Sequence, residues 1–503
     1  MMAQTAWPRR KAALLMTVGM LIAGPAYSGR TQSAGSAAQR SSPDNASVLS
    51  SLEARANAAY RDGHFDEAKQ LLEEIIERDP RSARAYALLG LTLARQNDLQ
   101  GAIRNLRQAH QIEPQSSDYS YDYSVVLLQD RQFAAAIPIL EKVRRQESQA
   151  PDVLVNLAQA YAGARQFQKL SASLQNLPPA DYSNPQLLKT LAIILGGAGQ
   201  ASAAAALWQA AIRHNPDQPL FYAALAELWI AHGQSNRALA LLEGAPAAAR
   251  GPVYLYAYAR VQMASREYVQ AAQTFQQLTV QFPKNQRVWE QLITCNLLAG
   301  RLNEAEEVAE EAERNFPHAL EFPYQRAVVN YMLGRTAAAI KILAPLLQDG
   351  GSDPRPVLLM AVLQSETGDY AQAVRYFSRE EQMKSGCAAL ASYFYGATLL
   401  RMNRTRQAET ALEKAIQCRP QFALAEYRLG QALYREGKLD QALAVLEKAA
   451  RDDPKLAEPY YELAEVRRRL GDAAGARQAL ARYASLVKHV ANSDRDLLGH
   501  SLR

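Results

Sequence analysis

One repeated spacing, about 34 residues long, runs through most of this 503-residue chain and constrains its fold more than any other feature. The spacing is marked by a small residue after a turn, which recurs in steps of 34, 34, 68, 34, 33, 34, 34, 34, 35, 34 and 34. These residues are Ala68, Ala102, Ala136, Ala204, Ala238, Ala271, Ala305, Ala339, Ala373, Ala408, Ala442 and Ala476, with Leu170 at the midpoint of the double step. Chance does not hold one register over so many steps, so residues 49–490 are predicted to be 13 copies of one structural unit.

Other residues keep the same phase and indicate that each copy is a pair of helices. A glycine such as Gly233 or Gly437 stands five residues before the small residue and permits a tight turn. A proline such as Pro80 or Pro454 stands twelve residues after it and ends the second helix, because proline cannot continue a helix. Because one such pair has no core of its own, neighbouring pairs must stack to bury their apolar faces.

In its period and in these landmark residues the chain resembles the tetratricopeptide repeat (TPR) family. The resemblance covers residues 49–490 and is closest in residues 83–116, 286–319 and 423–456. It implies an all-α fold, a right-handed α-solenoid (superhelix) of about 13 tandem helix-turn-helix units. It also implies an inner wall, built mainly from first helices, that holds a peptide or a helix of a protein partner. The partner is not identified, because this fold serves many processes.

Three joints are expected near residues 177–185, 244–252 and 349–355, where clusters of proline and glycine interrupt the second helix early. Two interpretations stay open for these joints. They are either hinges between rigid blocks or units in which the repeat pattern has degenerated.

The N-terminal segment 1–28 has the pattern of a secretory signal peptide. Arg9, Arg10 and Lys11 precede an apolar run, Ala12–Ala23, which is too short to span a bilayer. Cleavage is expected before Gly29 or, alternatively, after Ala26; an uncleaved anchor helix is the other interpretation. Residues 29–48 are expected to be a flexible leader and residues 491–503 a tail. We therefore expect an exported protein, periplasmic or secreted in a bacterial envelope, with no integral membrane span after cleavage.

The sequence carries no pattern typical of an enzyme or of a nucleic-acid binder. The formal net charge is +6, and Arg9, Arg10 and Lys11 supply half of it, so the chain without its signal segment is close to neutral and no nucleic-acid partner is expected. Phosphate-binding loops, dinucleotide fingerprints, zinc-protease motifs and serine-hydrolase motifs are absent from the sequence. We therefore expect no catalytic residues, no metal site and no cofactor.

The family resemblance also suggests which side chains of the last units line the groove. They are Tyr393, Tyr427, Tyr434, Tyr461, Arg401, Arg428, Arg435 and Arg468. Tyrosine supplies flat apolar area with a hydroxyl, and arginine pairs with carboxylates, so a ligand-binding strip is one interpretation. The other is that these tyrosines are ordinary members of the repeat pattern and that Glu462 and Glu465 offset part of the charge.

The cysteines allow one disulfide. Cys387 lies just before a first helix and Cys418 near the end of the second helix of the same unit. Antiparallel helices bring these two ends together, and an exported protein meets an oxidising environment. Two free thiols remain the alternative to a Cys387–Cys418 disulfide, while Cys295 occupies a packing position.

These observations predict a non-enzymatic protein–protein interaction scaffold of the cell envelope that binds a peptide or a partner helix in its groove. The first alternative is a periplasmic accessory subunit of polysaccharide export or outer-membrane assembly. The second is the repeat arm of a glycosyltransferase. The sequence does not predict the oligomeric state.

Overall fold

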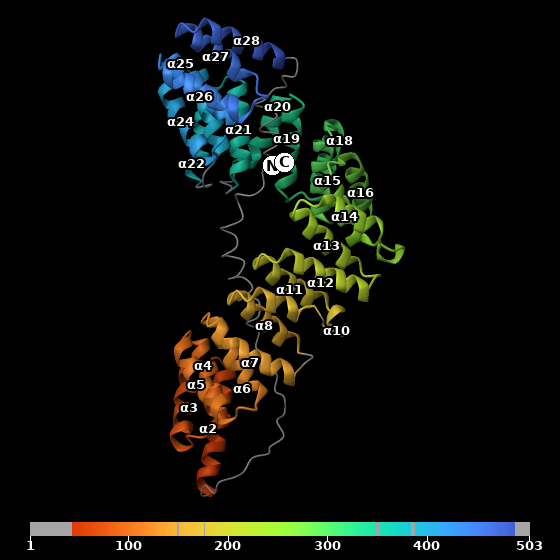
Figure 1. Cartoon of the computed structure of the whole chain (residues 1–503), viewed down its shortest axis with the longest axis vertical. Helices are drawn as coiled ribbons and strands as arrows, with labels where there is room; N and C mark the ends of the chain where they lie inside the picture. Colours follow the sequence, from red (N-terminus) through yellow and green to blue (C-terminus); the bar gives the residue numbers. More distant parts are fainter. Residues whose placement is uncertain (1–42, 148–149, 176, 348–352, 384–387, 488–503) are drawn as a thin grey trace. The chain divides into compact units, whose positions relative to one another are not determined.

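The computed structural model describes residues 43–147, 150–175, 177–347, 353–383 and 388–487. These residues form α-helices, one short 3-10 helix and connecting turns, and no β-strand lies among them (Figure 1). The all-α repeat fold expected from the sequence is therefore confirmed.

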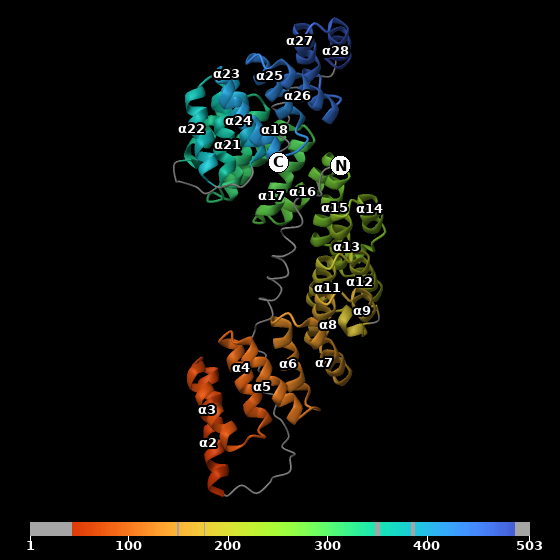
Figure 2. The same cartoon turned by 60° about the vertical axis from the view of Figure 1, so that its left-hand side comes forward.

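The described residues contain 13 antiparallel helix pairs, one for each expected unit, and Figure 2 shows how first and second helices alternate along the chain. The pairs are α2 (Pro43–Arg61) with α3 (Phe65–Arg78), α4 (Ala83–Arg95) with α5 (Leu99–Ile112), α6 (Ser117–Gln129) with α7 (Phe133–Gln146), α8 (Pro151–Gly163) with α9 (Phe167–Ser173), α11 (Pro185–Gly197) with α12 (Ala201–His214), α13 (Pro219–Ala231) with α14 (Ser235–Glu243), α15 (Pro252–Ala264) with α16 (Tyr268–Gln281), α17 (Gln286–Leu298) with α18 (Leu302–Asn315), α19 (Glu321–Met332) with α20 (Thr336–Leu346), α21 (Pro354–Glu366) with α22 (Tyr370–Gln382), α23 (Ala389–Arg401) with α24 (Thr405–Cys418), α25 (Ala423–Arg435) with α26 (Leu439–Asp452), and α27 (Glu458–Arg469) with α28 (Ala473–Leu486). The short helix α10 (Pro179–Tyr182) and the 3-10 helix η1 (Ala247–Ala249) lie between pairs.

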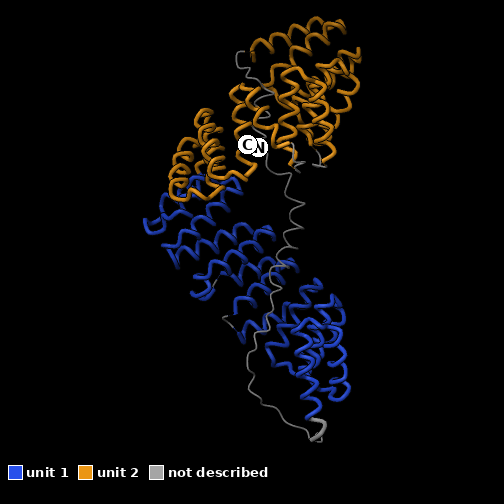
Figure 3. Tube along the Cα trace, turned by 180° about the vertical axis from the view of Figure 1, so that it is seen from behind, with its two compact units in different colours: residues 1–261 blue, residues 262–503 orange. Residues whose placement is uncertain are grey.

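The chain divides into two compact units within α15, between Val261 and Gln262 (Figure 3). Within each unit, the second helix of a pair packs both on its own first helix and on the first helix of the next pair, as α5 does with α4 and α6. Each unit has an apolar core of its own made from these contacts.

The small residues that mark the repeat lie at the helix crossings. All of them, and Leu170, have no exposed surface except Ala476 in the last pair, which is 8% exposed. Close approach is also visible eight residues into a first helix, where Gly430 faces Leu446 of α26. A Cβ atom at Gly430 would lie only 2.5 Å from Cγ of Leu446, so the glycine lets the leucine touch the helix backbone.

The turn between the two helices of a pair has the same conformation in all 13 pairs. One residue in each turn has a positive φ angle, between 58° and 88°, in the left-handed region. Glycine occupies eight of these positions, and the other five are Asn97, Arg131, Arg165, Arg266 and Asn403. The arginines are unexpected, because a side chain in this region costs about 1–2 kcal/mol.

The three expected joints coincide with shortened second helices. Helix α9 has 7 residues, α14 has 9 and α20 has 11, whereas α5 and α7 have 14. The early interruption of the helix is therefore observed, with α10 and η1 filling the first two joints. The hinge interpretation remains a prediction.

Several sequence expectations fall outside the described residues. They are the signal peptide at 1–28, the tail at 491–503, residues 349–352 of the third joint, and Cys387. Helix α2 begins at Pro43, six residues before the first unit expected from the repeat register at residue 49, whose boundary stays a prediction. Proline at the first position of a helix fits this start, since its missing N–H has no helical partner there.

Replacing Arg131 by glycine should stabilise the protein by up to about 1 kcal/mol. Glycine adopts the left-handed conformation without strain, and this gain exceeds the cost of its larger conformational entropy in the unfolded chain. Arg104→Gly is the matched control, since Arg104 is exposed within α5, where glycine should cost about 1 kcal/mol. Equilibrium denaturation followed by circular dichroism measures both. Destabilisation of equal size in the two variants would contradict the account of the turn.

Candidate functional site

The family resemblance assigns the groove to residues 2, 5, 6, 9, 12 and 13 of each unit, and this side of the first helices is called here the first-helix face. The sequence placed a ligand strip on this face in the last three units. Some of those side chains are exposed in the structure, and others make contacts between repeats.

Two of the four predicted tyrosines are core residues, which corrects their assignment to an exposed strip. Tyr393 has no exposed surface, and its ring centroid lies 5.0 Å from that of Phe394 and 5.2 Å from that of Phe422. Tyr427 is 8% exposed. The fifth position of a unit therefore faces the junction with the next pair, where an aromatic ring fills the space between helices.

Two of the predicted arginines bind the backbone of the preceding pair. Arg401 donates from Nη1 to the carbonyl oxygen of Ser365 at 3.3 Å, and Arg435 does so to that of Leu400 at 2.7 Å. Both carbonyls lie in the last turn of a first helix, and each also accepts a backbone N–H of the following turn, from Gly368 and from Asn403 respectively. Both arginine residues remain exposed, but these hydrogen bonds link each repeat to the one before it.

A polar network joins α25 to α27 across the same surface. Nε2 of Gln431 donates to the hydroxyl of Tyr427 and to Oε1 of Glu462, each at 2.8 Å. Arg428 donates to Oε1 of Gln431 at 3.1 Å, and its guanidinium lies 5.2 Å from the ring centroid of Tyr427. These contacts hold Arg428 in place against its own helix.

The side chains of this strip that stay accessible are Tyr434, Tyr461 and Arg468. Tyr434 is half-buried, with the guanidinium of Arg469 4.5 Å from its ring centroid. Tyr461 is 46% exposed, and Arg468 is exposed and paired with Glu465 on its own helix. The predicted strip is thus reduced to a smaller aromatic and basic surface.

The sequence analysis missed an acidic cluster on the first-helix face nearer the N-terminus. Asp118 and Asp122 lie one turn apart on α6, and Asp152 lies on α8, which packs against α6. Tyr121 lies between the two helices, and its hydroxyl accepts a hydrogen bond from Nδ2 of Asn156 at 3.0 Å. In the sequence, only the repeat positions of these three aspartates indicated the cluster, because they stand at the second and sixth positions of their units.

Burial and the repulsion between negative charges shift the pKa values of this cluster. Burial, together with the negative charge of Asp118, raises the pKa of Asp122 to about 7. Burial and the neighbouring carboxylate of Asp152 raise the pKa of Tyr121, so this hydroxyl stays protonated. The two adjacent helices therefore place three carboxyl groups and a protonated tyrosine hydroxyl close together, with Asp122 partly protonated near neutral pH.

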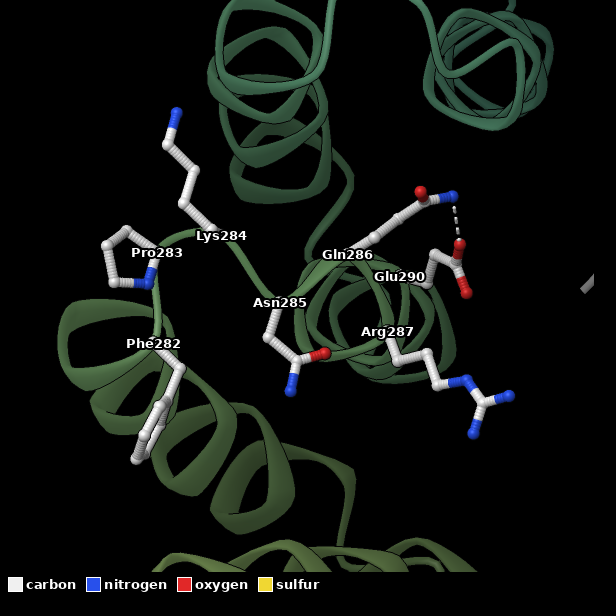
Figure 4. A pocket seen from close by; sticks show the side chains of 7 residues that line it. All are labelled: Phe282, Pro283, Lys284, Asn285, Gln286, Arg287 and Glu290. Atoms are coloured by element: carbon white, nitrogen blue, oxygen red, sulfur yellow. Dashed lines mark hydrogen bonds between the residues drawn. The ribbon is translucent and has the colours of Figure 1, made fainter.

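The described part of the chain shows no constellation of catalytic or metal-binding groups. Among these residues, no three His, Cys, Asp or Glu side chains are placed to share a metal ion. A hollow at the connection from α16 to α17 is lined by Phe282, Pro283, Lys284, Asn285, Gln286, Arg287 and Glu290. Figure 4 shows these side chains spread around one connection, with Gln286 donating to Glu290 at 2.8 Å. They do not converge on a common point.

Two further expectations concern the cysteines and the membrane. Cys418 is disulfide-bonded in the structure, whereas Cys387 lies outside the described residues, so their pairing stays a prediction. Cys295 is fully buried, as its packing position indicated.

Within the described ranges, none of the helices combines the length and the apolar character that crossing a bilayer requires.

Comparison with sequence families gives matches over most of the repeat region. Profiles described as "Tetratricopeptide repeat" match residues 53–117, 256–319 and 299–354 in one case and residues 127–194 and 197–261 in another. A third, described as "TPR repeat", matches residues 430–471. No curated protein matches the chain.

Solved structures with a similar fold include yeast Tom70, with 15% identity over 88% of this chain and 99% of that chain and a TM-score of 0.43. A chain of the APC/C hetero-tetramer Cut9–Hcn1 has 13% identity over 91% of this chain and 97% of that chain, with a TM-score of 0.41. MamA from Desulfovibrio magneticus RS-1 has 24% identity over 34% of this chain and 95% of that chain, with a TM-score of 0.31.

The raised pKa of Asp122 predicts a stability that depends on pH. The folded chain holds this proton more tightly than the unfolded chain, so the stabilisation is complete below about pH 4 and is lost as the pH rises through about 7. Asp122→Asn should therefore raise the denaturation midpoint much more at pH 8 than at pH 4, where the carboxyl is protonated in the folded chain. The matched control is Asp62→Asn, which makes the same substitution at an exposed position. A pH-independent effect of Asp122→Asn would contradict the burial of this carboxyl.

Proposed function

Because the chain belongs to the tetratricopeptide repeat family, we propose that it is a non-enzymatic scaffold of the cell envelope that holds a peptide or helix of a partner on its first-helix face. Repeats of this kind are protein–protein interaction modules, and their stacked helices present an extended surface for a partner. The coarse function therefore follows from the family, and the place of binding and the compartment are our proposal.

The observation that carries the proposal is the contrast between structural and accessible side chains on the first-helix face. Tyr393 packs in the core, and Arg435 donates to a backbone carbonyl of the preceding pair. Both contacts hold the repeat array together. Tyr461 keeps 46% of its surface exposed, and Arg468 on the same helix is exposed as well. Aromatic side chains that are partly exposed beside charged groups are typical anchors of protein interfaces.

Support for the envelope comes from the N-terminal sequence alone. A positive cluster at Arg9–Lys11, a short apolar run and small residues before Gly29 are the three parts of an export signal. The outer-membrane-assembly and polysaccharide-export alternatives share this compartment. Identification of the bound partner separates them from a more general scaffold.

One experiment in cells tests the compartment and the binding face together. A photo-cross-linking residue is placed at Leu220 or Tyr461 on first helices and at Arg104 or Ala206 on second helices, all exposed positions. We expect the mature chain in the envelope fraction to begin at Gly29 or Tyr27, and the first-helix positions to cross-link to one protein partner.

Two results would contradict the proposal. Intact chains that begin at Met1 in the cytoplasm would exclude export. Cross-links formed only from the second-helix positions, or none from any position, would exclude the first-helix face as the binding surface.

A further inference from the structure

A cavity lies between helices α22, α23 and α24, which all belong to the second compact unit (Figure 2). Its volume is about 350 Å³. This is at the small end of the range of about 300–1,000 Å³ that is typical of sites for small ligands. Side chains of all three helices line the cavity, and none of them stands at a position of the first-helix face. The cavity is therefore separate from the surface on which we propose partner binding.

A small residue at the fourth position of a unit leaves room for this cavity. The side chain at this position reaches the preceding second helix, as the hydroxyl of Tyr460 does when it donates to the carbonyl oxygen of Ala450 at 3.5 Å. The unit that begins at Ala389 has Ser392 at this position, and Ser392 lines the cavity. In four other units a large aromatic residue stands there: Tyr86, Tyr222, Trp289 and Tyr460.

A buried carboxylate is the second departure from the repeat pattern at this cavity. Glu380 of α22 stands at the twenty-seventh position of its unit, where the other twelve units have an apolar or aromatic residue, such as Ala415 or Ala449. Glu380 is only 4% exposed, and it lines the cavity together with Ser392. A buried carboxylate costs a fold far more than a buried alanine. Packing alone therefore does not explain why glutamate stands at this position.

The other side chains of the lining suit a ligand with a flat or aliphatic body. The rings of Phe377 and Tyr395 both line the cavity, and their centroids lie 5.4 Å apart. Glu381 is the second carboxylate of the lining and pairs with Lys414, the one basic side chain among the described residues around the cavity. Acidic groups therefore outnumber basic groups in the lining, which favours a positively charged ligand.

We propose that this cavity binds an organic cation, namely an amine, amidine or guanidine group carried on a flat or aliphatic body. The cation donates hydrogen bonds to the carboxylate of Glu380, and the body packs against the rings of Phe377 and Tyr395. Glu380 also has contacts within the chain, but a carboxylate has about four lone-pair sites and can accept further donors. The ligand is a free small molecule or an arginine or lysine side chain of a protein, because both present this chemistry.

Ligand-observed NMR with the full chain tests the proposed chemistry. Benzamidine is the cationic probe, and benzamide and benzoate carry a neutral and a negative group on the same ring. We expect benzamidine to bind at least about tenfold more tightly than either of the other two. Acetyl-Gly-Arg-Gly-amide is then added as a competitor. Displacement of benzamidine by this peptide would identify a protein side chain as the source of the cation, and failure to displace it would identify a free molecule.

Two substitutions test the named residues. Glu380→Gln removes the charge at nearly constant size and should weaken benzamidine binding by about tenfold or more. Its control is Glu413→Gln, at an exposed position of α24. Ser392→Tyr introduces the residue type that other units have at this position and should abolish binding by filling the cavity. Its control is Ser51→Tyr, at an exposed position of α2. Both controls should change the affinity by less than about twofold.

Three results would overturn this inference. They are no binding of benzamidine, equal binding of benzamide or benzoate, and unchanged affinity of a correctly folded Glu380→Gln or Ser392→Tyr variant. Circular dichroism checks the fold, and Ser392→Tyr alone decides if Glu380→Gln does not fold, because it returns the unit to the common pattern. None of these results affects the proposed function, which depends on cross-links from the first-helix face.

Discussion

The whole array depends on one contact, in which a small residue of a first helix lets a large side chain of the second helix reach the backbone. In three pairs a Cβ on the glycine would lie 2.5 to 2.6 Å from Cγ of a leucine sixteen residues later: Gly90 with Leu106, Gly396 with Leu412, and Gly430 with Leu446. One pair reverses the sizes, since Ile293 and Ala309 occupy the equivalent positions and both have no exposed surface. In each of these pairs a small residue on one helix admits a large one from the other, and this contact sets how closely the two helices cross.

This contact also explains how much of the fold could be predicted from the sequence. Because each unit needs small residues at the same places, these residues recur at a fixed period in the sequence. The number of helix pairs, their turns and the buried small residues such as Ala442 could therefore be predicted from one sequence. Left-handed turns at Arg131 and Arg165 could not be recognised from residue type, because arginine does not favour that conformation. Only their place in the repeat register indicates them.

The candidate site was less predictable, because a surface position acquires its role from the neighbouring repeat. Tyr393 is core because Phe422, the residue just before the next first helix, packs beside it, whereas Tyr461 in the last pair is 46% exposed. Arg435 bonds to the carbonyl oxygen of Leu400 in the preceding unit, which its own sequence context does not reveal. The acidic cluster was missed for the same reason, because Asp122 is perturbed by its burial between helices and by Asp118 one turn away.

A double-mutant cycle on Gly430 and Leu446 tests the central contact most directly, with hydrogen exchange of the amides of α25 and α26 as the readout of local stability. In the wild-type background, Gly430→Ala should destabilise these helices by about 1–3 kcal/mol through overpacking. In the Leu446→Ala background the same substitution should stabilise them by up to about 1 kcal/mol, because its methyl group enters vacated space and alanine favours the helix. Equal effects in the two backgrounds would show that the glycine is not required by the leucine, and the account of the array would be wrong.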